Sequence, residues 1–153
     1  MPKTILNGAD GLRSALGQHL GYSDWLTIEQ ERINQFAEAT GDHQWIHVDE
    51  ERAKAGPFGA TIAHGYLTLS LVSYLVPQLM EVQGFAMGIN YGLNKVRFIH
   101  PVLVGSRIRG GAELVAIAEV AGGLQTTMLI TIDIEASTKP ACVAESLSRW
   151  MVH

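Results

Sequence analysis

The residues best suited to chemistry lie in one short stretch, Gly41-Asp42-His43-Gln44-Trp45-Ile46-His47. Asp42 and His47 are five residues apart, so a loop can turn both side chains toward one pocket. A carboxylate can orient or deprotonate water, and an imidazole titrates near neutral pH, so the pair suits general acid–base catalysis. The alternative is structural: Asp42 caps the segment that follows and His47 lies on the surface.

A metal site is a second possibility for this stretch. His43 and His47 have the i,i+4 spacing of a zincin motif, but Gln44 stands where that motif needs a glutamate base. The stretch also follows a predicted helix end, so the two imidazoles would not share one helical face. We therefore expect no metal ligands here.

His64-Gly65 precedes a long apolar segment and offers a different function. A glycine at the start of a buried helix exposes a backbone N–H at the positive end of the helix dipole, where it can stabilise an oxyanion. The alternative is that Gly65 only permits close packing. Two turns later, the Ser73 hydroxyl needs a polar partner within the apolar run, and Asp42 is one candidate.

The position of Asp42 depends on the helix predicted just before it. Thr27 and Gln30 match a capping box, and Gly41 suits a left-handed helix stop, so Asp42 is predicted to follow the helix on a loop. The predicted helix carries on one face Ile33, Phe36, Ala37 and Thr40.

The other elements of the first half are shorter or more apolar. The pattern predicts an amphipathic segment over 9–19, a strand over 22–28 and a short helix over 49–55. The apolar helix should run from His64-Gly65 to about residue 76, because Pro77 disfavours its continuation.

The second half is predicted to be all strand, over 87–98, 106–119, 124–137 and 141–152. Polar and apolar residues alternate in the segment 124–137, which is typical of a sheet with one solvent-exposed face. Parallel neighbours need long crossovers, so the sheet must be antiparallel. The fold class is α+β, an antiparallel sheet packed on one long apolar helix.

The 153 residues fit a single domain, 1–153. A net charge of −4 gives no basic field for nucleic acid, and Cys142 alone cannot form an internal disulfide. The start shows no signal-peptide pattern. The segment 62–80 approaches a bilayer-spanning length, but its polar residues and lack of basic flanks argue against a span. We expect a cytoplasmic protein.

Several of these motifs occur together in one known family. Residues 36–47, Ala63-His64-Gly65 and residues 67–73 resemble the MaoC-like hydratases, which include (R)-specific enoyl-CoA hydratases of the hotdog fold. The sequence of residues 42–47 is similar to that of the branch that includes nodulation protein N-like dehydratases. Arg97-Phe98, Pro101-Val102 and Gly105 resemble the family's strand after the central helix. The resemblance covers about residues 25–110.

The resemblance implies a homodimeric hotdog domain, with the sheet wrapped around its central helix and the active site near the subunit interface. Asp42 and His47 would hold the reacting water, the Gly65 N–H would polarise the thioester carbonyl, and Ser73 would lie near the aspartate. Substrate contacts are expected from Gln44, Trp45 and His64. The family commonly has Asn-Pro where this chain has Gln44-Trp45, and an aspartate where it has Ser106.

The implied reaction adds water to trans-2-enoyl-CoA to give (R)-3-hydroxyacyl-CoA, or removes it. It needs no metal or other cofactor, and coenzyme A enters only as part of the substrate. One alternative is an acyl-CoA thioesterase, which would release thiol without consuming the enoyl group. Another is a non-catalytic acyl-thioester binding subunit, although a pure binder has no need of Asp42, His47 and Gly65 together.

Overall fold

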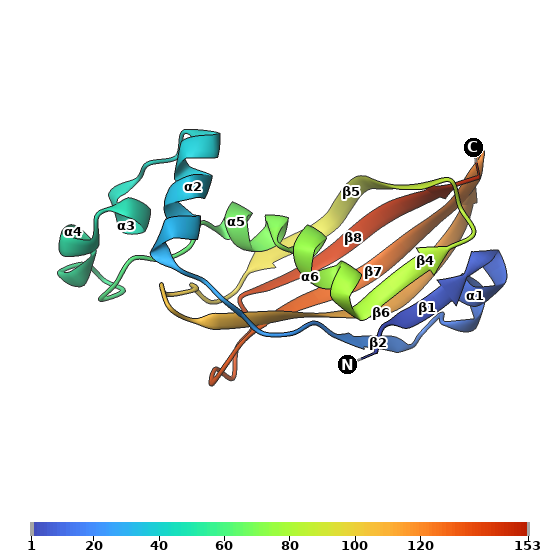
Figure 1. Cartoon of the computed structure of the whole chain (residues 1–153), viewed down its shortest axis with the longest axis horizontal. Helices are drawn as coiled ribbons and strands as arrows, with labels where there is room; N and C mark the ends of the chain where they lie inside the picture. Colours follow the sequence, from blue (N-terminus) through green and yellow to red (C-terminus); the bar gives the residue numbers. More distant parts are fainter. Residues whose placement is uncertain (1, 153) are drawn as a thin grey trace.

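A curved antiparallel sheet wraps around one side of a central helical segment, with three further helices at one end (Figure 1). The computed structural model describes residues 2–152. The helices are α1 (Gly8–Ser14), α2 (Gln30–Thr40), α3 (Trp45–Val48), α4 (Glu50–Lys54), α5 (Gly65–Ser70) and α6 (Val72–Leu79). The strands are β1 (Thr4–Asn7), β2 (His19–Tyr22), β3 (Leu26–Thr27), β4 (Met80–Gln83), β5 (Met87–Phe98), β6 (Arg107–Val120), β7 (Gly123–Ile134) and β8 (Cys142–Met151).

The main sheet has the strand order β2-β6-β7-β8-β5, and β3 also pairs with β6. All of its pairings are antiparallel, and the four long strands match the predicted segments to within a few residues. Along β7, half-buried and buried residues alternate from end to end, as the sequence predicted. The α+β class and the hotdog arrangement of a sheet around a helix are confirmed.

The central helix consists of α5 and α6, which follow each other with one break at Leu71 (Figure 1). Its buried side faces the sheet through Leu67, Leu71, Leu75 and Leu79. A Cβ atom built on Gly110 of β6 would lie 3.2 Å from the Leu75 Cβ, so glycine there permits the close approach of helix and sheet. The predicted end at residue 76 is wrong. Pro77 lies inside α6. Its missing N–H removes one helical hydrogen bond, and burial of Leu79 in the last turn offsets that loss.

The N-terminal third departs from the predicted elements. The helix expected over 9–19 ends at Ser14, because Gly17 and Gln18 hydrogen-bond to Leu114 of β6 and the chain then joins the sheet edge. Of the strand expected over 22–28, only Tyr22, which ends β2, and the two residues of β3 are strand. A separate parallel pair, β1 with β4, was not foreseen. Within residues 2–152, no helix has the length and apolar character needed to span a membrane.

Strand β5 forms one edge of the main sheet and pairs only with β8. Nearly its whole length is exposed, although it carries several large apolar side chains. These are Met87, Ile89, Tyr91, Leu93 and Phe98. A long apolar edge strand is an aggregation hazard unless another chain covers it.

Candidate active site

Asp42 lies on a loop directly after α2, as predicted. Gly41 closes that helix with φ 81°, in the left-handed region that glycine tolerates, and its N–H donates to Ala37 O. The loop turns into the short helix α3, which carries His47. The Asp42 carboxylate is exposed and accepts a 3.3 Å hydrogen bond from the Gln44 N–H.

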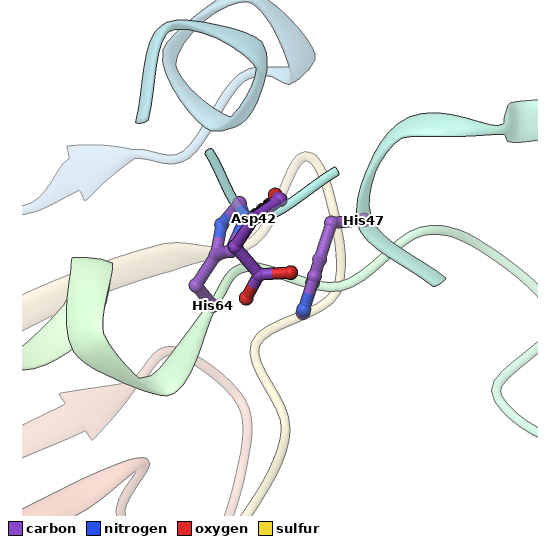
Figure 2. Close-up of side chains that lie close together, drawn as sticks. All are labelled: Asp42, His47 and His64. Carbon is purple, nitrogen blue, oxygen red and sulfur yellow. Dashed lines mark hydrogen bonds between the residues drawn. The ribbon is translucent and has the colours of Figure 1, made fainter. Parts of the chain in front are cut away.

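The structure brings Asp42 and His47 together and adds His64 to them (Figure 2). One polar side-chain atom from each residue lies within 4.8 Å of those of the other two. Both histidines are buried, with exposed fractions of 6% for His47 and 3% for His64. Their rings stack with centroids 3.9 Å apart and planes 22° apart. The acid and the imidazole therefore meet, and their catalytic roles stay predictions.

Main-chain carbonyls fix the tautomers of both rings. His47 Nδ1 lies 2.7 Å from Ile62 O, and His64 Nε2 lies 3.0 Å from Asp42 O. A carbonyl oxygen only accepts, so each of these nitrogens carries its hydrogen and donates. In the neutral rings, His47 Nε2 and His64 Nδ1 are then free acceptors. Among the described residues, the buried His64 Nδ1 has no hydrogen-bond partner.

The environment keeps His47 neutral. Burial lowers the pKa of His47 from its ordinary value of 6.5, and the neighbouring His64 adds to the lowering. The hydrogen bond to Ile62 and the charge of Asp42 oppose this shift without cancelling it. A neutral imidazole with an unprotonated Nε2 is the form that can accept a proton from water.

Gln30 and Thr61 form hydrogen bonds that support the His47 backbone, a role that the sequence analysis did not predict. Gln30 Nε2 donates a 2.8 Å hydrogen bond to His47 O, and the buried Thr61 hydroxyl donates to Gln30 Oε1. The capping box predicted from Thr27 and Gln30 is wrong. Thr27 belongs to β3, and Glu29 is the N-cap residue without a side-chain cap. The Gln30 amide is engaged by the site instead.

Gly65 begins α5, so its N–H belongs to the helical first turn, which has no intrahelical acceptor. The residue lines a cavity of about 290 Å³ together with Phe98 and Ile62. Ile62 also accepts the His47 hydrogen bond through its carbonyl oxygen, but neither His47 nor Asp42 is among the residues that line this cavity. A Cβ atom at position 65 would lie 3.1 Å from the Phe98 ring. The structure is thus compatible with both interpretations of Gly65, an exposed donor and a close-packing residue.

The structure also places the three other residues that the sequence singled out. Ser73 is eight residues beyond Gly65, about 12 Å along a helix, and lines a different cavity, and its proximity to Asp42 stays a prediction. Gln44 is exposed and contributes its backbone N–H to the loop. Trp45 is half-buried, with the Arg52 guanidinium 4.3 Å from its ring centroid.

Ser73 belongs to a groove between the central helix and the sheet. The groove consists of two adjoining cavities of about 370 and 260 Å³, which have several lining residues in common. The cavities are lined mostly by apolar residues, and the residues common to both are Val72, Ser73, Asn90, Ile130 and Ser146. The groove opens along β5, the exposed edge strand.

Asp42, His47 and His64 are also ligand types for a metal ion. The stacked rings do not suit one shared ion, because an ion in the plane of one ring lies out of the plane of the other at 3.9 Å separation. The zincin spacing of His43 and His47 does not form a site either. His43 is exposed and lies 3.4 Å from Glu38.

The hotdog fold, with a carboxylate beside a buried, neutral imidazole, places this chain in the class of hotdog-fold enzymes. Residues 12–133 match the MaoC-like domain. The chain is 56% identical over 150 residues to 3-hydroxyacyl-thioester dehydratase Z of Mycobacterium tuberculosis (strain ATCC 25618 / H37Rv), covering 97% of this chain and 99% of that protein. It therefore belongs to the MaoC-like dehydratase family, as the motifs indicated.

Two further comparisons agree with this assignment. Nodulation protein N of Rhizobium leguminosarum bv. viciae is 48% identical over 137 residues, covering 86% of this chain and 83% of that protein. The unliganded R-hydratase PhaJ1 from Pseudomonas aeruginosa superposes with a TM-score of 0.73 over 90% of this chain and 83% of its own, at 22% identity. The first relative matches the branch expected from residues 42–47, and the second shows the fold.

Proposed function

We propose that the protein adds water to a trans-2-enoyl-CoA to give an (R)-3-hydroxyacyl-CoA, or catalyses the reverse dehydration. The observation that carries this proposal is the meeting of Asp42 with a buried His47 that is held neutral. The similarity to a 3-hydroxyacyl-thioester dehydratase supports the reaction class. The (R) configuration rests on the family resemblance and on the R-hydratase fold.

The groups can be assigned roles in the hydration step. Water bound between the Asp42 carboxylate and His47 Nε2 adds its oxygen to C3 and transfers a proton to the pair. The Gly65 N–H donates to the thioester oxygen and stabilises the enolate charge that develops there. The pair then returns the proton to C2, so atoms and charges balance. No redox cofactor or metal is required, and coenzyme A is part of the substrate.

The groove beside α6 supports an acyl substrate. It starts near Leu69 and Ser70, just past the Gly65 turn, and extends to Pro77 and Met80. Its mostly apolar lining is suited to a hydrocarbon chain. In this proposal Ser73 contacts the acyl chain and has no proton to transfer.

A second copy of the chain is the proposed partner. The exposed apolar residues of β5 would be covered if two sheets joined edge to edge, which closes the sheet edge in a symmetric dimer. Replacing Leu93 by aspartate should convert the dimer to a monomer in light scattering. A wild-type protein that is monomeric at micromolar concentration would refute the dimer. We also propose a cytoplasmic location, which the lone, buried Cys142 favours.

One experiment separates the proposal from its rivals. Purified protein is mixed with crotonyl-CoA, and enoyl absorbance, free thiol and product chirality are followed together. A hydratase consumes the enoyl group without releasing thiol and yields the (R) product. Thiol release with the enoyl group intact identifies a thioesterase. Binding with neither change identifies a non-catalytic subunit.

A further inference from the structure

His64 contacts both members of the proposed catalytic pair. Its Nε2–H donates to the Asp42 carbonyl oxygen, and its ring stacks on the His47 ring at 3.9 Å. Phe36 of α2 packs on it from another side, with ring centroids 4.9 Å apart. One buried side chain at the start of the central helix therefore joins α2, the Asp42 loop and α3.

Asp42 itself has few other hydrogen bonds. The Asp42 N–H donates to Thr40 Oγ1 at 3.4 Å, and the Asp42 carboxylate accepts from the Gln44 N–H at 3.3 Å. Both bonds are long, and both partners belong to the same exposed segment. The 3.0 Å bond to His64 is shorter and ties the loop to a different element. The loop is also tied to α3, because the His47 N–H donates a 3.0 Å hydrogen bond to Gln44 O, so the His64 bond is the contact that ties Asp42 to the start of the central helix.

The second ring nitrogen of His64 fits the same tautomer. The buried Nδ1 has no hydrogen-bond partner among the described residues, so no contact there competes with the bond from Nε2–H to Asp42 O. The described contacts therefore engage His64 in holding a neighbour in place.

We propose that His64 is a positioning residue, which sets the placement of the Asp42 carboxylate against the His47 ring. It acts through these two residues and does not exchange a proton with the substrate. This assigns His64 a different role from the substrate contact expected from the resemblance. The inference rests on the proposed hydratase function, and its test is arranged so that the two can fail separately.

Two substitutions separate the hydrogen bond from the stacking. His64→Gln places an amide N–H near the position of Nε2 but removes the aromatic ring. His64→Phe keeps an aromatic face against His47 but removes the donor. His43→Gln is the matched control, since His43 is the exposed neighbour of Asp42 and has no part in the cluster.

We expect His64→Phe to lower kcat on crotonyl-CoA roughly 10- to 100-fold, because misplacing a reacting group by about 1 Å costs about that much. KM should change less than about twofold, since no substrate contact is lost. His64→Gln should recover a large part of kcat, and His43→Gln should match wild type. Thermal unfolding of each variant shows that the chain is folded.

Three results would overturn the inference. They are wild-type kcat in His64→Phe, equal losses in His64→Gln and His64→Phe, or a rise in KM with unchanged kcat. A readout independent of activity is NMR of the histidine ring nitrogens. It should show His64 as the Nε2–H tautomer, and an Nδ1–H tautomer at His64 contradicts the proposal even if a variant fails to fold. An inactive wild type would instead refute the hydratase function.

Discussion

Replacing Asp42 by asparagine should abolish most of the activity and leave the fold unchanged. The carboxylate is exposed, and an asparagine Oδ1 can still accept the 3.3 Å hydrogen bond from the Gln44 N–H. The carbonyl oxygen that His64 contacts is in the backbone and is present in both residues. The substitution therefore removes the negative charge and its proton-accepting capacity while keeping every described contact of the residue.

The size of the effect follows from this separation. General acid–base groups contribute roughly 10²- to 10⁴-fold to a rate, which is about 2.7 to 5.5 kcal/mol of transition-state stabilisation. The free energy of unfolding should stay within about 0.5 kcal/mol of wild type, as for other exposed sites without special contacts. His47 and the Gly65 N–H remain in place, so a small residual rate is expected.

The assay measures hydration of crotonyl-CoA by loss of enoyl absorbance, with urea unfolding run in parallel. Asp24→Asn is the matched control, because it makes the same chemical change at an exposed aspartate outside the site. A variant that keeps near-full kcat would refute the role of Asp42. A variant that loses both activity and stability would show that the carboxylate is structural.

Three further predictions concern His47, Gly65 and Leu75. Burial lowers the pKa of His47, so the acid limb in the pH profile of kcat/KM should lie below about pH 6.5. The unfolded chain binds the His47 proton more tightly than the folded chain does, so the stability contribution of His47 should be full above that pH and decline as pH falls toward the folded pKa. Urea unfolding of wild type and His47→Gln at several pH values checks the direction of this stability change. Gly65→Ala should lose about 1–3 kcal/mol because its Cβ would meet the Phe98 ring at 3.1 Å, and Phe98→Leu should restore part of the loss in thermal unfolding; an alanine variant as stable as wild type would show that the ring moves freely. Leu75→Ala should cost about 2–5 kcal/mol in urea unfolding, since the side chain is fully buried between α6 and the sheet, whereas a loss under 1 kcal/mol would mean that the interface collapses around the cavity.

The elements with a strong local pattern could be predicted from the sequence. Alternation in β7 identified its buried face, and Gly41 identified the end of α2 because few other residues tolerate a φ of 81°. The approach of Asp42 to His47 was predicted from their separation of five residues, although His47 lies on the short helix α3 and not on the loop.

Contacts between distant segments could not be predicted in this way. The stack of His47 on His64 joins residues seventeen positions apart, and nothing in the spacing indicates that two imidazoles meet. Gln30 matched a capping pattern, but tertiary structure gave its amide a better partner in the His47 carbonyl. Ser73 follows the family pattern in sequence, and the structure adds that it lines the groove between the central helix and the sheet.

The two imidazoles are oriented by oxygen atoms that belong to peptide groups, Ile62 O and Asp42 O. A peptide oxygen exists whatever side chain stands at that position. Exchange of Ile62 for another aliphatic residue should therefore leave the His47 orientation intact, and sequence drift at position 62 carries no penalty for the tautomer. Because Ile62 contributes only its backbone, the site tolerates mutation at position 62, whereas His64 and the reacting residues contribute side chains and are sensitive to mutation.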